Sequence, residues 1–253
     1  MKHSQTLQKL FANQKALPII CSHRGGKENV PENSMASFKQ SAANGIHCME
    51  NDIQLTRDDK IVIIHDSTVN RTTNSKGAVR ELSLSELQTL DAGTWFNPSF
   101  KNERIPTLEE FLGVCKGVPL IEIKKYERYS EKLEVVLLET LKIYNRLYSS
   151  IIHSFDLDVL ERLHKLDKNL NLGYLIEEPT IEIPKWVKGI HPEKDLLNEE
   201  NLLEWRSKKL WVASWTYTNV SQFSNSKILP DIIITDIPIE AKNYFEANPT
   251  KSS

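Results

Sequence analysis

Three acidic residues stand in strand-like segments where their side chains could share one site. Glu50 and Asp52 are two residues apart in an apolar-flanked segment, so both side chains point to the same face of a strand. Glu122 has a comparable place in a later segment, and Lys124 follows it on the same face. Carboxylates gathered in a dry interior do not stay ionised without positive charge. This pattern predicts a site for one divalent cation.

Two histidines, His23 and His65, each end a β-rich run. An imidazole changes charge near neutral pH, so either ring could transfer protons to or from a substrate held at the cation. Taken singly, each residue also has a structural interpretation. A rim ion pair would explain Glu122 with Lys124, and a core hydrogen bond would explain either histidine. The functional interpretation therefore depends on whether the fold brings these residues together.

Strand-like apolar runs alternate with helical patterns, which is typical of βα units around a parallel sheet. The run 61–66 is separated from the preceding strand only by residues 54–60, too few for a parallel crossover. We therefore expect a β-hairpin over 49–66 that returns His65 towards Asp52. The remaining strands number eight and predict a (β/α)8 TIM barrel, whose sites lie at the C-terminal strand ends. They are expected near 18–23, 46–53, 118–124, 150–155, 171–176, 188–191, 210–215 and 231–235.

Capping residues mark where the helices begin. We expect Asn33 to cap a helix that ends at Gly45, and Thr107 to form a capping box with Glu110. Three further helices are expected to follow caps, and an amphipathic helix is expected at the N-terminus. The caps are Ser130, Asp156 and Asn198, and the apolar positions of the N-terminal helix are Leu7, Leu10 and Phe11.

Residues 67–106 interrupt the alternation and predict a small insertion after the rim hairpin, with one short helix from Ser83 to Leu90. An insertion of this length commonly forms a wall or lid of a site. Trp95 and Phe96 could be apolar contacts of a lid or core residues of the insertion, and we expect them in the core. We expect Arg71 to stabilise the turn of the insertion. Because no linker or repeat is apparent, residues 1–253 are predicted to form a single domain.

The composition gives no indication of a polyanionic or membrane partner. The 253 residues carry a formal net charge of −2, so we expect no nucleic-acid binding. No apolar run is long enough to span a bilayer, and the first residues lack a secretory signal, which favours a cytoplasmic protein. Cys21, Cys48 and Cys115 form no CxxC pair and are expected to be reduced, buried thiols.

Several motifs together resemble the glycerophosphodiester phosphodiesterase family. In chain order they are HRG…PENS, ExDIxLTxD, HD…RTT…G, LDAGTWF…ERIPTLEEFL and IEIK, followed by SFD (154–156), SWT (214–216) and IITD (233–236). The resemblance runs from about residue 19 to residue 239. It implies a (β/α)8 barrel with a small inserted segment, one divalent cation and a small-molecule glycerophosphodiester substrate.

Matched by motif position, the resemblance implies that Glu50, Asp52 and Glu122 are the metal ligands, and that His23 and His65 are the general acid/base pair. All-oxygen ligands favour Mg²⁺ or Ca²⁺, with Mn²⁺ as a third candidate, over zinc. The expected reaction is hydrolysis to sn-glycerol 3-phosphate and an alcohol. The sequence leaves open whether water or the neighbouring glycerol hydroxyl attacks phosphorus, and which histidine is the acid.

The resemblance also implies the substrate contacts. Arg24 and Lys124 are expected to bind the phosphate, Trp215 to form the wall at the glycerol end, and Glu32 to support an arginine or histidine from behind. The chain departs from the family pattern at His153, where Gln is common. It departs again in SWTYTN, which displaces the asparagine to Asn219 and weakens it as a substrate contact.

Two other functions remain in view. The first is a phospholipase D-type activity on lysophospholipids, which would use Trp95, Phe96 and Phe100 to approach a lipid surface. The second is a non-catalytic barrel that binds phosphorylated ligands. The complete set of acidic residues and histidines favours the enzyme. The head group, the native metal and the oligomeric state, monomer or homodimer, stay open.

Overall fold

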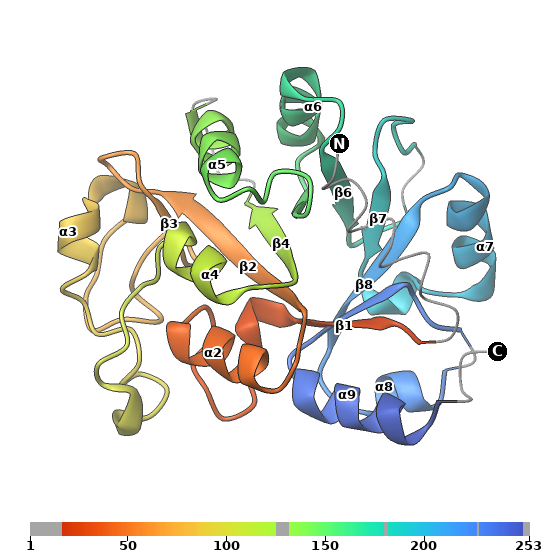
Figure 1. The fold of residues 1–253 in the computed structure, drawn as a ribbon, viewed down its shortest axis with the longest axis horizontal. Coiled ribbons are helices and arrows are strands. Elements are labelled where there is room, and N and C mark those ends of the chain that lie inside the picture. The colour runs from red at the N-terminus through yellow and green to blue at the C-terminus, as the bar shows by residue number, and fades with distance from the viewer. Residues whose placement is uncertain (1–16, 125–131, 180–181, 227, 250–253) are drawn as a thin grey trace.

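The computed structural model describes residues 17–124, 132–179, 182–226 and 228–249. Within these ranges eight parallel strands form a closed barrel, because β1 pairs with β2 on one side and with β9 on the other. Helices cover the barrel from outside (Figure 1). The predicted (β/α)8 architecture is therefore confirmed. The strands are β1 (Ile19–Ser22), β2 (Cys48–Leu55), β4 (Val118–Ile123), β5 (Ile151–Ser154), β6 (Asn171–Ile176), β7 (Gly189–Pro192), β8 (Trp211–Tyr217) and β9 (Ile232–Thr235).

Helices connect most of these strands, as the alternating pattern predicted. The connection 177–188 between β6 and β7 differs, since its described residues form no helix. Among the helices that the structure describes, none combines the length and apolar character needed to cross a membrane. The helices around the barrel are α2 (Met35–Ala43), α4 (Leu108–Val114), α5 (Lys132–Ile143), α6 (Leu157–Leu166), α7 (Glu199–Ser207), α8 (Ser221–Ser224) and α9 (Pro238–Ala247).

The helix caps follow the predictions with one correction. Thr107, Asp156 and Asn198 cap α4, α6 and α7. For α2, the prediction of Asn33 is wrong, because the Ser34 hydroxyl accepts from the Ser37 amide at 3.1 Å. Asn33 instead adopts a left-handed backbone with φ of 51° and sends its side chain into the barrel. The predicted cap Ser130 and the N-terminal helix lie outside the described residues.

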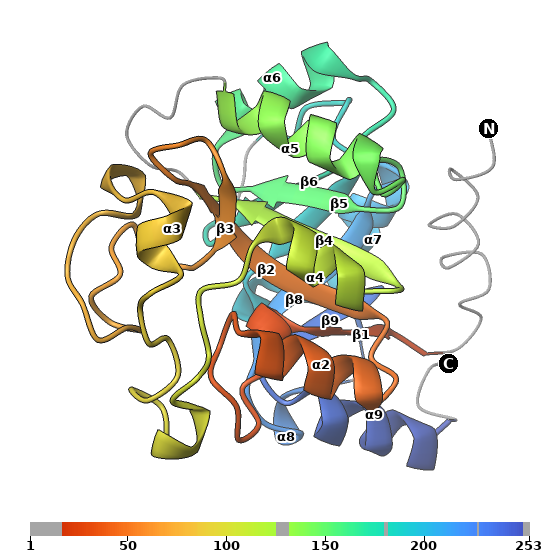
Figure 2. The same ribbon diagram turned by 60° about the vertical axis from the view of Figure 1, so that its left-hand side comes forward.

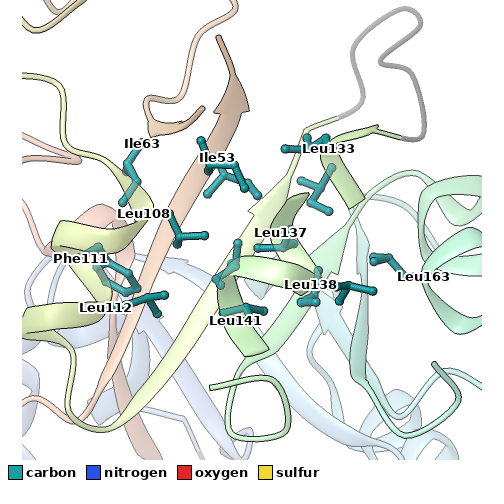
Figure 3. Close-up of a cluster of buried hydrophobic side chains, with 14 of the residues drawn as sticks. Ile53, Ile63, Leu108, Phe111, Leu112, Leu133, Leu137, Leu138, Leu141 and Leu163 are labelled. Carbon is teal, nitrogen blue, oxygen red and sulfur yellow. The ribbon is translucent and has the colours of Figure 1, made fainter. Parts of the chain in front are cut away.

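The predicted hairpin is present. Strand β3 (Ile61–Ile63) pairs antiparallel with β2, with Ile53 opposite Ile63 and Leu55 opposite Ile61. Asp59 provides the left-handed position of the turn, with φ of 62°. The outer face of this hairpin packs against α4 and α5 through a cluster that includes Ile53, Ile63 and Phe111 (Figure 3). This packing fixes β2, and with it the acidic residues that β2 carries.

The insertion packs beside the barrel (Figure 2), around a small apolar core that it shares with the returning arm of the hairpin. Helix α3 (Leu84–Leu87) begins after Ser83 as predicted and ends three residues sooner than expected. The expectation that Trp95 and Phe96 are core residues is wrong, because each is 38% exposed. They form edge-on ring contacts with one another, and Phe96 also contacts Phe100. The core consists of Val62, Ile64, Val69, Val79, Leu87, Ala92 and Ile105.

The cysteines are free and buried, as expected. Burial raises the pKa of Cys115 to about 12 and raises that of Cys21 well above its ordinary value. The thiolate is the reactive form, so at pH 8 only about one Cys115 in 10⁴ is reactive. We expect Ellman's reagent to leave the folded protein essentially unmodified over minutes, and to modify all three thiols in denaturant. Fast stoichiometric reaction without denaturant would contradict this burial.

Candidate active site

A pocket of about 610 Å³, which includes space open to solvent, lies at the C-terminal end of the barrel. Asp52 is fully buried beneath it, and Glu32 lies behind Arg24. The fold therefore brings the predicted site residues to one place. Those that line the pocket directly are His23, Arg24, Glu50, His65, Glu122, Lys124 and Trp215.

A tight turn after β1 positions Arg24. Its φ of 52° is left-handed, and Gly25 follows with φ of 83°. A Cβ atom on Gly25 would lie 2.2 Å from the Ser37 hydroxyl, so only glycine lets the turn pack this closely on α2. The turn directs the Arg24 amide to Glu50 Oε2, to which it donates at 2.7 Å. The sequence HRGG thus aims both the backbone and the guanidinium of Arg24 at the acidic residues.

Asp52 lies deepest in the acidic cluster and is held by positive charge. It stands opposite Glu122 in the pairing of β2 with β4. Lys124 Nζ lies 2.7 Å from Asp52 Oδ1 and 2.6 Å from Glu122 Oε1, so one ammonium serves both carboxylates. Arg24 Nε is 3.4 Å away and Asn33 donates at 2.7 Å. Although burial opposes it, Lys124 and Arg24 hold the pKa of Asp52 well below its usual range.

Nearby positive charge compensates the carboxylates of Glu50 and Glu122 less well than that of Asp52. Burial, reinforced by repulsion from Asp52 and Glu122, raises the pKa of Glu50 well above its ordinary value. Burial also raises the pKa of Glu122 to about 7, against the attraction of Lys124. The three carboxylates of this cluster face two cations, Arg24 and Lys124. If all are ionised, one negative charge is left over, and a bound cation would balance it.

The donor atoms present fit a divalent cation. Oxygens of Glu50 and Glu122 and a ring nitrogen of His153 lie within 4.8 Å of one another. Glu50 Oε1 and His153 Nε2 are buried and have no hydrogen-bond partner among the described residues. Buried polar atoms are normally satisfied, so these two atoms indicate a site made for a ligand. The geometric cluster contains His153 where the sequence predicted Asp52, whose oxygens contact Lys124 and Asn33.

His23 is oriented by a carboxylate from the other end of the chain. Its Nδ1 lies 2.6 Å from Oδ1 of Asp236, the residue after β9, and Lys27 Nζ lies 3.2 Å from the other carboxylate oxygen. Burial lowers the pKa of His23 below 6.5 despite this hydrogen bond. An ionised Asp236 accepts the Nδ1 proton, which leaves Nε2 unprotonated in the neutral ring.

A carboxylate also orients His65, as Asp236 orients His23. Its Nδ1 lies 2.7 Å from Asp66 Oδ1, and burial again lowers the histidine pKa. Arg71 donates to both oxygens of Asp66 and to Glu32, which also accepts from Arg24. Hydrogen bonds from Arg71 lower the pKa of Asp66 to about 2. Arg71 therefore connects the insertion to the site, where the sequence had suggested only a local turn.

Aromatic side chains form one side of the pocket. Trp215 donates from Nε1 to the backbone oxygen of His191 at 2.8 Å and meets Phe155 edge-on, with ring centroids 5.5 Å apart. Asn219 does not reach this wall. It is exposed just before α8, where its backbone N–H donates to Gln222 Oε1. The displacement of this asparagine in the sequence agrees with its position outside the pocket.

Among the residues that sequence reasoning missed are Asp66, Asp236 and Arg71, which bind the predicted histidines and Glu32. The first two share a signal, because each follows a strand-like apolar run in IVIIHD or DIIITD, where barrel sites lie. Nothing in the sequence pairs Asp236 with His23, since 213 residues separate them. The pairing appears only when β9 closes the barrel beside β1.

Two carboxylate-bound histidines above an acidic cluster, at the C-terminal end of a (β/α)8 barrel, define a barrel hydrolase site. Comparison with known proteins agrees. Residues 23–240 match the model of the glycerophosphoryl diester phosphodiesterase family. The chain belongs to this family of phosphoric diester hydrolases.

Individual relatives show the same likeness. A glycerophosphodiester phosphodiesterase of Caldanaerobacter subterraneus is 39% identical over 65% of this chain and 69% of its own. One from Bacillus altitudinis is 32% identical over 90% of this chain and 98% of its own. An Oleispira antarctica phosphodiesterase, solved with the product sn-glycerol-3-phosphate, superposes with a TM-score of 0.83 at 26% identity. That match covers 91% of this chain and 97% of the other.

Proposed function

We propose that this chain hydrolyses glycerophosphodiesters to sn-glycerol 3-phosphate and an alcohol by two-histidine acid/base catalysis that depends on a divalent cation. The observation that carries the proposal is the pair of Asp-bound histidines, which line the same pocket as the buried acidic cluster. A phosphodiester needs three things from such a site. Its non-bridging oxygens must be neutralised, its nucleophile activated and its leaving alcohol protonated.

The side chains provide each of these. One of His23 and His65 removes a proton from the attacking oxygen, which belongs to water or to the neighbouring glycerol hydroxyl, as the new P–O bond forms. The other donates a proton to the alcohol oxygen as its bond to phosphorus breaks. If the hydroxyl attacks, water must then open the resulting cyclic phosphate to give sn-glycerol 3-phosphate. Asp236 and Asp66 hold each ring by Nδ1, so that Nε2 makes the transfer. Arg24 and Lys124 face the pocket and would bind the charged phosphoryl oxygens.

Glu50, Asp52 and Glu122 would hold the divalent cation, which when bound supplies Lewis-acid stabilisation of the phosphoryl oxygens. When all three are ionised, their excess of one negative charge over Arg24 and Lys124 supports this assignment. Trp215 and Phe155 give the glycerol end of the substrate an apolar wall. Glu32 supports Arg24 from behind.

A direct assay tests the proposal. We expect release of sn-glycerol 3-phosphate from glycerophosphocholine, glycerophosphoethanolamine and glycerophosphoglycerol, with Mg²⁺, Ca²⁺ and Mn²⁺ each added separately. The exposed Trp95 and Phe96 are the one observation that favours a lipid substrate, so lysophosphatidylcholine belongs in the panel. Faster turnover of lysophosphatidylcholine than of glycerophosphocholine would favour the phospholipase D-type alternative. Absence of turnover on every diester would contradict the proposed function.

A further inference from the structure

Three buried or half-buried rings form a hydrogen-bonded chain that ends at the pocket. Trp211 on β8 donates from Nε1 to His191 Nε2 at 3.2 Å. His191 on β7 meets His153 on β5 through their Nδ1 atoms, 3.0 Å apart. His153 and His191 are 2% and 0% exposed. The far nitrogen of His153, Nε2, belongs to a pocket-lining side chain and lies 4.0 Å from Glu50 Oε1.

The chemistry of the three rings fixes where the protons are. An indole nitrogen only donates, so His191 Nε2 must accept and carries no proton. The neutral His191 ring then has its proton on Nδ1, which donates to His153 Nδ1. Because His153 Nδ1 accepts, its own proton is on Nε2. The chain of hydrogen bonds therefore presents an N–H group, and not a lone pair, beside Glu50.

The barrel is built to hold this chain. A Cβ atom on Gly173 would lie 2.4 Å from His191 Nε2, and one on Gly189 would lie 1.9 Å from Trp211 Nε1. The two glycines thus leave the space that the His191 and Trp211 rings occupy. The resulting order is asymmetric, because Trp211 at one end can only donate. His153 Nε2 at the other end is buried and has no hydrogen-bond partner among the described residues.

We propose that His153 is a substrate-binding hydrogen-bond donor, which places its Nε2–H on an oxygen of the bound phosphodiester beside Glu50, and that it is not a metal ligand. His191 and Trp211 are positioning residues that hold its tautomer. The inference rests on the proposed function for the identity of the substrate. Metal ligation by His153 Nε2 would require the reverse order of protons. That order would place the His191 Nε2 proton against the Trp211 N–H.

The tautomers can be observed without substrate. With ¹⁵N-histidine labelling, long-range ¹H–¹⁵N spectra of the wild type at pH 7.5 are expected to show His153 protonated at Nε2 and His191 at Nδ1. Trp211→Phe removes the fixed donor, so both histidines are expected to lose a single tautomer. A wild-type His153 that is protonated at Nδ1, or tautomers unaffected by Trp211→Phe, would overturn the proposal.

Metal binding separates a donor from a ligand. We expect His153→Leu to bind Mn²⁺ by calorimetry with wild-type affinity, and Glu122→Gln to bind it much more weakly. The loss of a hydrogen bond to a charged substrate is expected to lower kcat/KM of His153→Leu by about 10–100-fold. His153→Gln keeps an N–H donor and should recover most of that loss.

Weaker Mn²⁺ binding in both His153 variants, or equal loss of kcat/KM in both, would overturn the assignment. Thermal unfolding of each variant shows whether it is folded. If His153→Leu does not fold, Mn²⁺ binding is measured on Trp211→Phe, which is expected to keep the wild-type affinity. The predicted tautomers in a wild-type protein without diesterase activity would support the hydrogen-bond chain and overturn the proposed function, so the two failures are distinguishable.

Discussion

Replacing His23 by alanine is expected to lower kcat on a glycerophosphodiester by a factor of about 10²–10⁴, the usual contribution of one proton transfer. The same is expected for His65→Ala, because both rings line the pocket and both are held through Nδ1 by a carboxylate. Steady-state kinetics at saturating substrate measures the effect. Burial keeps the pKa of His23 below 6.5, so the basic ring is present at neutral pH and is lost only on acidification.

The matched control is His47→Ala, an exposed histidine outside the pocket. It should retain the wild-type kcat. The melting temperature and Mn²⁺ affinity of His23→Ala should also stay close to wild type, since the ring contacts Asp236 and not the acidic cluster. Activity near wild type in either His23→Ala or His65→Ala would remove that histidine from the acid/base pair.

Removal of divalent cations is expected to abolish turnover and to lower the melting temperature. When its three carboxylates are ionised, the acidic cluster carries one more charge than Arg24 and Lys124 balance. Burial and carboxylate repulsion raise the pKa of Glu50, so a bound cation would favour the ionised cluster. A ligand that binds only the folded state stabilises it by about 2.7 kcal/mol at one hundred times its dissociation constant. Dialysis against EDTA, followed by titration with Mg²⁺, Ca²⁺ or Mn²⁺ under thermal unfolding and in the assay, measures both effects.

Glu50→Gln sharpens this test, because it removes one ionisable carboxyl from the cluster and keeps the shape of the side chain. The EDTA-treated variant is expected to melt at a higher temperature than the EDTA-treated wild type, since an unbalanced buried carboxyl has been replaced. Added cation should no longer raise its melting temperature. Glu139→Gln, on the exposed face of α5, is the control and should respond like wild type. A wild type that keeps full activity in EDTA would contradict metal dependence.

Much of the fold could be predicted from local sequence. Apolar runs of strand length and their separations gave the barrel, and the short connection 54–60 identified β3 as the return of a hairpin. The errors arose where tertiary contacts decide between local alternatives. Asn33 and Ser34 are both good capping residues, but Asn33 is drawn to Asp52 in the barrel. Trp95 and Phe96 have core-like side chains, although the insertion is too small to bury them.

The site was predictable to the extent that residue type and strand position determine it. The alternation of side chains along β2 and β4 placed Glu50, Asp52 and Glu122 together. Hydrogen-bond partners from distant segments were not predictable, because no local sequence pattern determines which side chains meet across neighbouring strands. The partners of His153 illustrate this limit. The pairing of β4 with β5 places His153 directly opposite Glu122, and this register brings it into the acidic cluster.

Arg71 connects the insertion to the reacting groups of this barrel. It extends from the insertion to Glu32 and Asp66, and these carboxylates are the partners of Arg24 and His65. The inserted segment is therefore part of the electrostatic environment of the reacting groups. A change in this segment would therefore alter the proton affinity of His65, and with it the catalytic rate, without any substitution among the residues that line the pocket.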